Sequence, residues 1–194
     1  MITVISPDYF KTIPWKNGLG STTELAISSG GKLDDFAWRL SIATVDNNGV
    51  FSDFSGYQRD LVLIAGKGIT LEHDGKSTDN LTKLLDVAHF DGGSKTVGTL
   101  SHGSIKDFNI MTKQGHYSAK VNTYTNKQVV TMPAQSELVF VYSLSSYCQV
   151  SQASLTTSVP TGSLARIDND EHLSKHDISI SGENMIVIEL TKVT

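Results

Sequence analysis

The sequence predicts an all-β protein, a sandwich or a barrel, on the strength of three observations. Apolar and polar residues alternate with a period of two, which is typical of strands that bury one face. The apolar runs are short and are separated by Gly- and Asp-containing turns at close intervals. No segment of the 194 residues has the periodicity of a long amphipathic helix. Roughly a dozen short strands with such turns are characteristic of sandwiches and barrels.

The first half of the chain shows this alternation most clearly in residues 36–45. There Trp38, Leu40 and Ile42 would point to one side of a strand, and the residues between them to the other. Further strands are expected over 61–65, over 69–73 as its hairpin partner, and over 81–90, 96–100 and 107–113.

The second half continues the pattern, except in the polar stretch 168–181, which is expected to be mainly loop. No low-complexity linker divides the chain. We therefore expect one compact body over residues 1–194, built from two similar β halves of approximately 1–105 and 106–194. The expected strands of the second half are 117–124, 128–132, 138–144, 147–152, 163–167 and 185–190.

Composition restricts the class of protein. Hydrophobic residues make up 39% and charged residues 19%, which is typical of a soluble globular chain. The net charge of −4 and the lack of a basic run argue against nucleic acid as a partner. No apolar stretch approaches the about 20 residues of a membrane helix, and the N-terminus does not resemble a secretory signal. With Cys148 as its single cysteine, the chain is expected to be cytoplasmic.

The run from Pro14 to Glu24 is expected to be an irregular loop with unusual chemical variety. Proline fixes its own φ, and the two glycines allow a close backbone approach. Two interpretations stay open: a binding loop on a rigid scaffold, or a tryptophan plug under an Asn-Gly turn. The groups concerned are the ring of Trp15, the cation of Lys16, the amide of Asn17, the hydroxyl of Thr22 and the carboxylate of Glu24.

Two strands carry polar side chains on one face. Arg39 and Ser41 share a face of the 36–45 strand, and Asp107 and Asn109 share a face of the 107–113 strand. One interpretation is that these faces meet solvent. The other is that they line an interior pocket, where an arginine would bind a carboxylate with two hydrogen bonds and the amides and carboxylates would orient the rest of a small ligand.

The segment 49–60 is a second candidate for the pocket. Phe51 and Phe54 are typical of plugs under a loop. Arg59 either forms a surface pair with Asp60, which would contribute little, or reaches the pocket. The sequence does not choose between these two interpretations.

Metal-binding and nucleophile motifs are missing from the sequence. Its six histidines include no His-x-His pair. His172 and His176 are four residues apart but lie in a polar stretch without the glutamate of a metalloprotease motif. The sequence has no Gly-x-Ser-x-Gly elbow and no phosphate-binding loop, and Cys148 is typical of a small core residue.

Five motifs occur in a fixed order, and together they resemble the HutD/Ves family from about Phe10 to Gly115, and more weakly beyond. Two departures are Leu19, where the family usually has a third consecutive glycine, and Val50, where it tends to have proline. The motifs are Pro14-Trp15-Lys16-Asn17-Gly18-x-Gly20-x-Thr22-x-Glu24, Trp38-Arg39-Leu40-Ser41-Ile42-Ala43, Gly49-Val50-Phe51-Ser52-x-Phe54-x-Gly56-x-x-Arg59, Gly66-x-Gly68-x-x-Leu71 and Asp107-Phe108-Asn109-Ile110-Met111.

The resemblance implies a bicupin, two cupin-type β-barrel halves in one chain. Most cupins bind a metal through a His-x-His and glutamate motif; this sequence lacks it, so no metal is expected at the usual place and no cofactor is expected. The HutD branch is associated with histidine utilisation, with formylglutamate, formiminoglutamate or urocanate as candidate ligands. The Ves branch is associated with cold and stress response. The motifs do not decide between the branches, and a homodimer is expected by fold analogy only.

Three functions follow as hypotheses. The first is a protein that binds a small carboxylated metabolite without a metal ion and has a regulatory role in histidine utilisation. The second is an enzyme, an isomerase or hydrolase acting on the same class of metabolite, and the sequence offers less for it because no nucleophile–base pair is present. The third is a structural or interaction protein whose polar groups merely satisfy the loop backbone. A stress-responsive protein, as the Ves branch implies, is a further alternative. The expected ligand-binding residues are Trp15, Asn17, Glu24, Arg39, Ser41, Arg59, Asp107 and Asn109.

Overall fold

The computed structural model describes residues 1–15, 20–169 and 176–193, and it is built almost wholly of strands. Over these ranges it has nineteen strands and a single short 3-10 helix, Pro7–Tyr9. The prediction of an all-β protein is therefore confirmed. None of the helical structure in these ranges is long and apolar enough to cross a membrane.

The strands form two compact units. Unit 1 consists of Met1–Tyr9 and Ala119–Lys192, and unit 2 consists of Phe10–Ser118 together with the C-terminal Val193. Sequence analysis placed the joint between halves near residue 105. In the structure Ile105 begins a strand inside unit 2, and the first strand of the chain belongs to unit 1.

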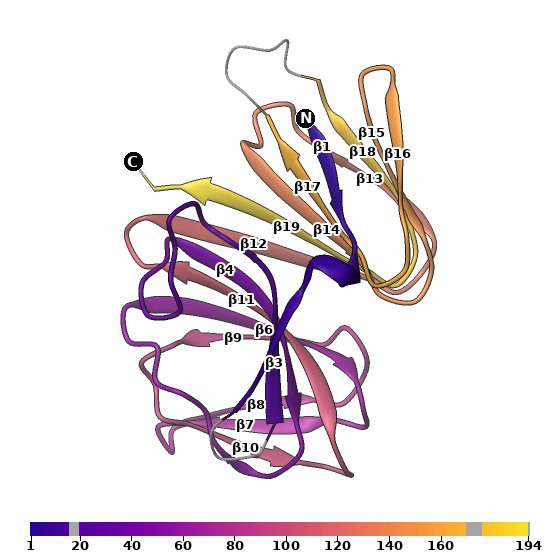
Figure 1. Cartoon of the computed structure of the whole chain (residues 1–194). Helices are drawn as coiled ribbons and strands as arrows, with labels where there is room; N and C mark the ends of the chain where they lie inside the picture. Colours follow the sequence, from indigo (N-terminus) through magenta and orange to yellow (C-terminus); the bar gives the residue numbers. More distant parts are fainter. Residues whose placement is uncertain (16–19, 170–175, 194) are drawn as a thin grey trace. The chain divides into compact units, whose positions relative to one another are not determined.

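Unit 2 contains a six-stranded and a four-stranded antiparallel sheet. Leu61 and Leu63 of the larger sheet and Ile69 and Leu71 of the smaller one share a hydrophobic core, so the two sheets pack face to face. In Figure 1, β4, β11 and β6 lie side by side in the larger sheet. The larger sheet has the order β2 (Lys11–Pro14), β3 (Gly20–Ile27), β4 (Trp38–Val45), β11 (Ile105–Lys113), β6 (Tyr57–Ala65), β9 (Val87–Asp91); the smaller has β5 (Gly49–Val50), β10 (Thr96–Leu100), β7 (Ile69–His73), β8 (Ser77–Leu81).

Unit 1 has the same plan, with a five-stranded and a four-stranded sheet. Its core cluster consists of apolar side chains, among them Val139, Val150, Ile178 and Val187, all fully buried. The five-stranded sheet has the order β1 (Ile2–Ile5), β17 (Leu164–Asp168), β14 (Leu138–Ser143), β19 (Met185–Lys192), β12 (Tyr117–Tyr124); the four-stranded sheet has β13 (Gln128–Met132), β18 (Ile178–Gly182), β15 (Cys148–Gln152), β16 (Leu155–Val159).

Two predictions about the strands were wrong, one about the extent of a strand and one about pairing. Residues 81–90 are not one strand, because the chain turns between β8 and β9 with Leu85 in the left-handed region at φ 72°. The stretch 61–65 does not pair with β7 either: β6 pairs with β11 and β9, and β7 pairs with β10 and β8. The true hairpin, β7–β8, closes at Asp74-Gly75, where both residues have positive φ.

Two stretches expected to be irregular contain strands. Pro14 is the last residue of β2, and the expected loop residues 20–24 lie in β3, which begins at Gly20. The end of the expected loop 168–181 is strand instead, because β18 starts at Ile178 and lies between β13 and β15. In both cases cross-strand pairing outweighs a composition that, read locally, favours turns.

Candidate functional site in the interior of unit 2

Five of the expected site residues are buried on one face of the six-stranded sheet. Arg39 and Ser41 lie on β4, Arg59 on β6, and Asp107 and Asn109 on β11, with exposed fractions of 5% or less. Their strand neighbours two positions away, such as Ala43 and Leu61, belong to the core between the two sheets. The polar face therefore points into the interior of unit 2, and the alternative that it meets solvent is wrong.

The register brings these residues together. On β11, Asn109 lies opposite Ser41 of β4 and Leu61 of β6, and Met111 lies opposite both Arg39 and Arg59. Alternate residues of one strand share a face, so Asp107 follows in the same row.

Arg59 is the central cation of this cluster. Its Nη2 donates to Asn109 Oδ1 at 2.7 Å. Three phenyl rings surround the guanidinium: its carbon lies 5.6 Å from the ring centroids of Phe51 and Phe54 and 5.1 Å from that of Phe90. Cation–π attraction of about 2 kcal/mol per desolvated contact offsets part of the cost of burying the charge. Burial still lowers the pKa of Arg59 to about 10, an effect opposed by the charge of Asp107.

Asp107 is the anionic end of the cluster. Asn109 Nδ2 donates to Asp107 Oδ1, so the Asn109 amide links Arg59 to Asp107. The aspartate is fully buried, and burial raises its pKa to about 7; the Arg59 charge and the Asn109 hydrogen bond act in the opposite direction. A group that titrates near neutrality inside a barrel is a candidate functional group.

Two polar atoms of this cluster are left without partners. Neither Arg59 Nε nor Asp107 Oδ2 has a hydrogen-bond partner within the parts of the chain that the structure describes, although both atoms are buried. An unsatisfied buried polar atom costs about 1–3 kcal/mol, and such atoms are normally matched by water or a ligand. The interior therefore contains one N–H donor, Arg59 Nε, and one carboxyl oxygen, Asp107 Oδ2, that a small ligand or water could hydrogen-bond.

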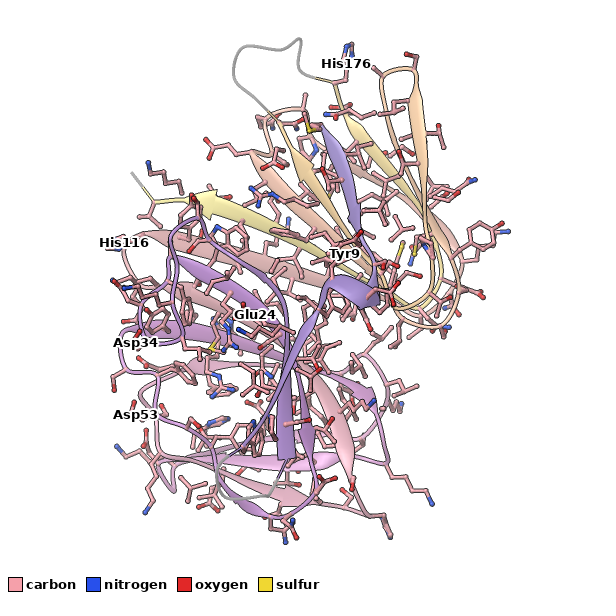
Figure 2. The ribbon with its side chains drawn as sticks, in the orientation of Figure 1. Tyr9, Glu24, Asp34, Asp53, His116 and His176 are labelled. Carbon is pink, nitrogen blue, oxygen red and sulfur yellow. The ribbon has the colours of Figure 1, made fainter. Side chains whose placement is uncertain are left out.

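Glu24 and Arg39 form a second pair at the same sheet face. Arg39 Nε donates to Glu24 Oε2 at 2.8 Å, with side-chain exposures of 5% and 24%. A β-bulge follows Glu24 where β3 pairs with β4. Figure 2 shows Glu24 within the strands of unit 2. Because the side chain of Glu24 is more exposed than that of Arg59, the Glu24–Arg39 pair lies nearer to solvent.

Three of the expected site residues come from the 14–24 run: Glu24, described above, and Trp15 and Asn17. Trp15 donates from Nε1 to Thr22 Oγ1 at 2.8 Å and packs against the core of unit 2. Its ring also lies against Gly20, where an added Cβ would come within 2.9 Å of it. Trp15 is thus partly buried and held in place by its neighbours, and its role in ligand binding stays a prediction. Asn17 lies outside the described residues.

The phenyl rings are functional candidates that sequence reasoning missed. Phe51 and Phe54 had been interpreted as plugs under a loop, and Phe90 had not been singled out. Phe90 lies directly opposite Arg59 on the neighbouring strand. No sequence signal identifies this pairing, because it depends on the register of β6 and β9, which the wrong strand assignment for 81–90 hides.

Arg59 and Asp60 do not form a surface pair. They are neighbours on a strand and so point to opposite faces. Asp60, 6% exposed, accepts from or shares a proton with His89 Nδ1 at 2.7 Å. Burial raises the pKa of Asp60, and His89 lowers it. Arg59 therefore belongs to the interior. Asp60 is a buried carboxyl on the other face of the sheet, which can be compared with Asp107.

Two surface hollows lie in unit 2. One of about 400 Å³ is lined by Ser55, Asp74 and Asp91, among others. The other, of about 360 Å³, includes Asp34, Asp53 and Phe54; Figure 2 shows its two acids on the same side of the unit. Neither is lined by the buried cluster, but Phe54 borders the second and also contacts Arg59. Within the described ranges, no group of three or more His, Cys, Asp or Glu could hold a metal ion.

Fold and interior together define a cupin-type β-barrel protein. A cupin 2 conserved barrel domain protein from Leptotrichia buccalis superposes with a TM-score of 0.53 over 93% of this chain and 96% of that one, at 10% identity, which shows the fold alone. The chain belongs to the HutD family, whose model matches residues 8–187. The HutD/Ves resemblance is thereby confirmed.

Individual relatives are similar over most of the chain. HutD from Pseudomonas fluorescens SBW25, in a structure described as a formate condition, has a TM-score of 0.85 and 33% identity over 99% of both chains. An "uncharacterized 21.2 kDa protein in hutC 3'region" of Pseudomonas putida is 37% identical over 144 residues, 74% of both chains. Protein Ves of Escherichia fergusonii is 34% identical over 144 residues, 74% of this chain and 73% of the relative.

Proposed function

We propose that the interior of unit 2 binds a small carboxylated metabolite without a metal ion, and that Arg59 binds the carboxylate. One observation carries the proposal: Arg59 is 5% exposed, yet its Nε–H has no partner within the described residues. A guanidinium matches the geometry of a carboxylate and binds it with charge-assisted hydrogen bonds.

Neighbouring residues support this role. Asn109 fixes the guanidinium through its hydrogen bond to Nη2, while Asp107 presents its second oxygen to the same interior. Ser41, 1% exposed, lies opposite Asn109 and adds a hydroxyl. Arg39 with Glu24 supplies a second charged pair for the rest of the ligand. Trp15, which packs against the core of unit 2, and Asn17, which lies outside the described residues, complete the proposed set.

The relatives' descriptions support a carboxylate as the class of ligand. The structure of Pseudomonas fluorescens HutD is described as a formate condition, and formate is the smallest carboxylate. The names HutD and hutC 3'region support a ligand from histidine utilisation, such as formylglutamate, formiminoglutamate or urocanate, and a regulatory role in the cytoplasm. The similarity to protein Ves supports the alternative, a stress-responsive protein.

Thermal unfolding with added carboxylates tests the proposal. Formate, formylglutamate and urocanate are each added to the wild type and to Arg59→Met, which keeps an apolar side chain among the three phenyl rings but removes the charge. A ligand at 100 times its Kd stabilises by about 2.7 kcal/mol, which raises Tm by about 5–10 °C for a chain of this size. We expect this shift in the wild type with at least one carboxylate and not in Arg59→Met.

Arg166→Met is the matched control. Arg166 is also an arginine near a phenyl ring, 6.0 Å from Phe140, but it lies in unit 1 and pairs with Asp168. This variant should keep the full ligand-dependent shift. The proposal fails if no carboxylate shifts the wild type, or if Arg59→Met responds as the wild type does. Should Arg59→Met not fold, Arg59→Lys, which keeps the charge but loses the fork of donors, should show a reduced shift.

A further inference from the structure

We infer that a carboxylate binds in the interior of unit 2 together with one proton, which Asp107 takes up on Oδ2. This inference rests on the proposed function, because it describes how the same site accommodates an anion. No bond of the ligand changes: solvent supplies a proton, an O–H bond forms at Asp107, and that O–H donates to the bound carboxylate.

Hydrogen-bond matching is the first argument. Asp107 Oδ1 already accepts from Asn109, so Oδ2 and Arg59 Nε are the buried atoms of this linked cluster that have no partner among the described residues. With Asp107 ionised, they are an acceptor and a donor, and a carboxylate, which only accepts, can match just one of them. With Asp107 protonated, both atoms are donors, and they match the two oxygens of a carboxylate.

Charge balance is the second argument. Among the described residues of the six-stranded sheet, the charges facing this interior come from Arg59 on β6, Asp107 on β11, and Arg39 of β4 paired with Glu24 of β3. From the four-stranded sheet comes His73, bonded to Thr96 and to Asp79, a residue that reaches solvent. The interior-facing residues of β9 are Ala88 and Phe90, and those of β10 that reach the cluster are uncharged.

Because Arg39 and Glu24 neutralise each other, Arg59 and Asp107 decide the balance at the binding atoms. If Asp107 is ionised, an added carboxylate leaves an uncompensated negative charge in a low-dielectric interior, which is costly. If Asp107 is protonated, the ligand's charge cancels that of Arg59. Two carboxyl groups that share one buried site accordingly retain one proton between them.

The proton is available at physiological pH. Burial raises the pKa of Asp107 to about 7 before any ligand is present. Carboxylate affinity should therefore be nearly constant below pH 7 and fall about tenfold for each pH unit above it. Proton uptake per bound ligand should be about 0.1 at pH 6 and about 0.9 at pH 8.

Isothermal titration calorimetry of the full chain with sodium formate tests this. Titrations at pH 6 and pH 8, each in two buffers of different ionisation enthalpy, give the number of protons taken up. We expect about 0.9 proton at pH 8 for the wild type and none for Asp107→Asn, whose affinity should no longer depend on pH. Asp60→Asn is the matched control, because it removes another buried carboxyl with a raised pKa on the opposite face of the sheet, and it should behave as the wild type.

Formamide serves as a second probe. It is neutral and carries one acceptor and one donor, so it matches Arg59 Nε and the ionised Oδ2 of Asp107. Its affinity should hold or rise above pH 7, opposite to formate.

The outcomes separate the two proposals. Formate that binds the wild type at pH 8 without proton uptake overturns the inference and leaves the proposed function standing. If formate does not bind at any pH from 6 to 8, the same titrations are made with the carboxylate that raises the Tm of the wild type, and absence of binding by formate, formylglutamate and urocanate alike overturns the proposed function itself. Proton uptake that persists unchanged in a folded Asp107→Asn also overturns the inference, and the wild-type measurement decides the matter if that variant does not fold.

Discussion

Asp107 is a carboxyl group that the fold keeps from ionising at moderate pH. Its pKa is raised to about 7 in the folded chain by burial, against a usual value of 3.8. The folded state therefore holds the proton more tightly than the unfolded state does. The unfolding free energy therefore falls with rising pH: the contribution of Asp107 to stability is fully present below about pH 3.8 and is lost as the pH rises through 7.

Comparison with Asp107→Asn isolates this effect at the residue scale, since other groups titrate alike in both proteins. Between pH 5 and pH 8 the wild type should lose on the order of 2–3 kcal/mol of unfolding free energy relative to the variant. Urea unfolding at several pH values in the absence of ligand measures the difference. A difference that does not change with pH would show that Asp107 is not held protonated by the fold.

Sequence reasoning reached the residue scale only in part. The alternation in 107–111 correctly predicted that Asp107 and Asn109 share a face, and the alternation in 36–45 did the same for Arg39 and Ser41. It could not predict that these faces point inward, because alternation fixes which residues share a face and not which face is covered. That they bind a ligand stays a prediction.

At the scale of elements, the segment between β5 and β6 positions two of the three phenyl rings around Arg59. Phe51 N donates to Thr96 O at 2.9 Å, and Phe54 N donates to Gly92 O at 2.8 Å. Backbone hydrogen bonds thus fix this segment to β10 and to the turn after β9. The rings are held against the guanidinium by the main chain, so packing around Arg59 should respond to changes in the neighbouring strands.

Gly98→Ala tests this dependence. A Cβ at Gly98 would lie 2.6 Å from a ring carbon of Phe51 and 3.1 Å from Ile69. The ring must move away from Arg59, so we expect a loss of about 1–3 kcal/mol in stability and weaker carboxylate-dependent stabilisation. Gly49→Ala is the control, because Gly49 pairs with Gly98 but an added Cβ there meets nothing within 4 Å. Equal effects of the two substitutions in calorimetric melting would contradict the assignment of Phe51.

The element scale also shows why several strands escaped sequence analysis. β1 and β5 have four and two residues, too few alternations to be distinguished from turns. β8 and β16 consist mostly of polar residues, among them Ser, Thr, Asp and Asn, which read locally as turn residues. β3 was hidden because Gly20, Thr22 and Thr23 read locally as loop residues, whereas pairing with both β2 and β4 makes them strand.

At the scale of the whole molecule, two units of the same plan differ in what they enclose. The core of unit 1 is formed by apolar side chains, whereas unit 2 encloses Arg59, Asp107 and Asn109 beside its apolar core. Composition and strand count predicted the all-β fold correctly. The asymmetry between the units was not predictable in this way, because it depends on which alternate positions each sheet turns inward.

Unit 1 depends on the first strand of the chain. Ile2 and Val4 pack against its core, and β1 pairs with β17 through Ile2–Ile167 to Ile5–Leu164. Deletion of residues 1–5 should therefore cost on the order of 3 kcal/mol, measured by urea unfolding. Thr3→Ala, at an exposed position of the same strand, should change stability by less than about 0.5 kcal/mol. An unchanged unfolding midpoint after the deletion would mean that β17 does not need its partner.

The pairing of β1 with β17 has a consequence for the nascent chain. The sheets of unit 2 all lie within Phe10–Ser118, so they can close while the ribosome is still making the later strands. β1 leaves the ribosome before the other described strands, yet its partner β17 is made only after all the strands of unit 2. At about 5–20 residues per second, β1 waits roughly 10–30 s with both of its edges open. A fusion partner attached before β1 would therefore interfere with the pairing of β1 and β17 during synthesis, more than it would disturb the finished fold.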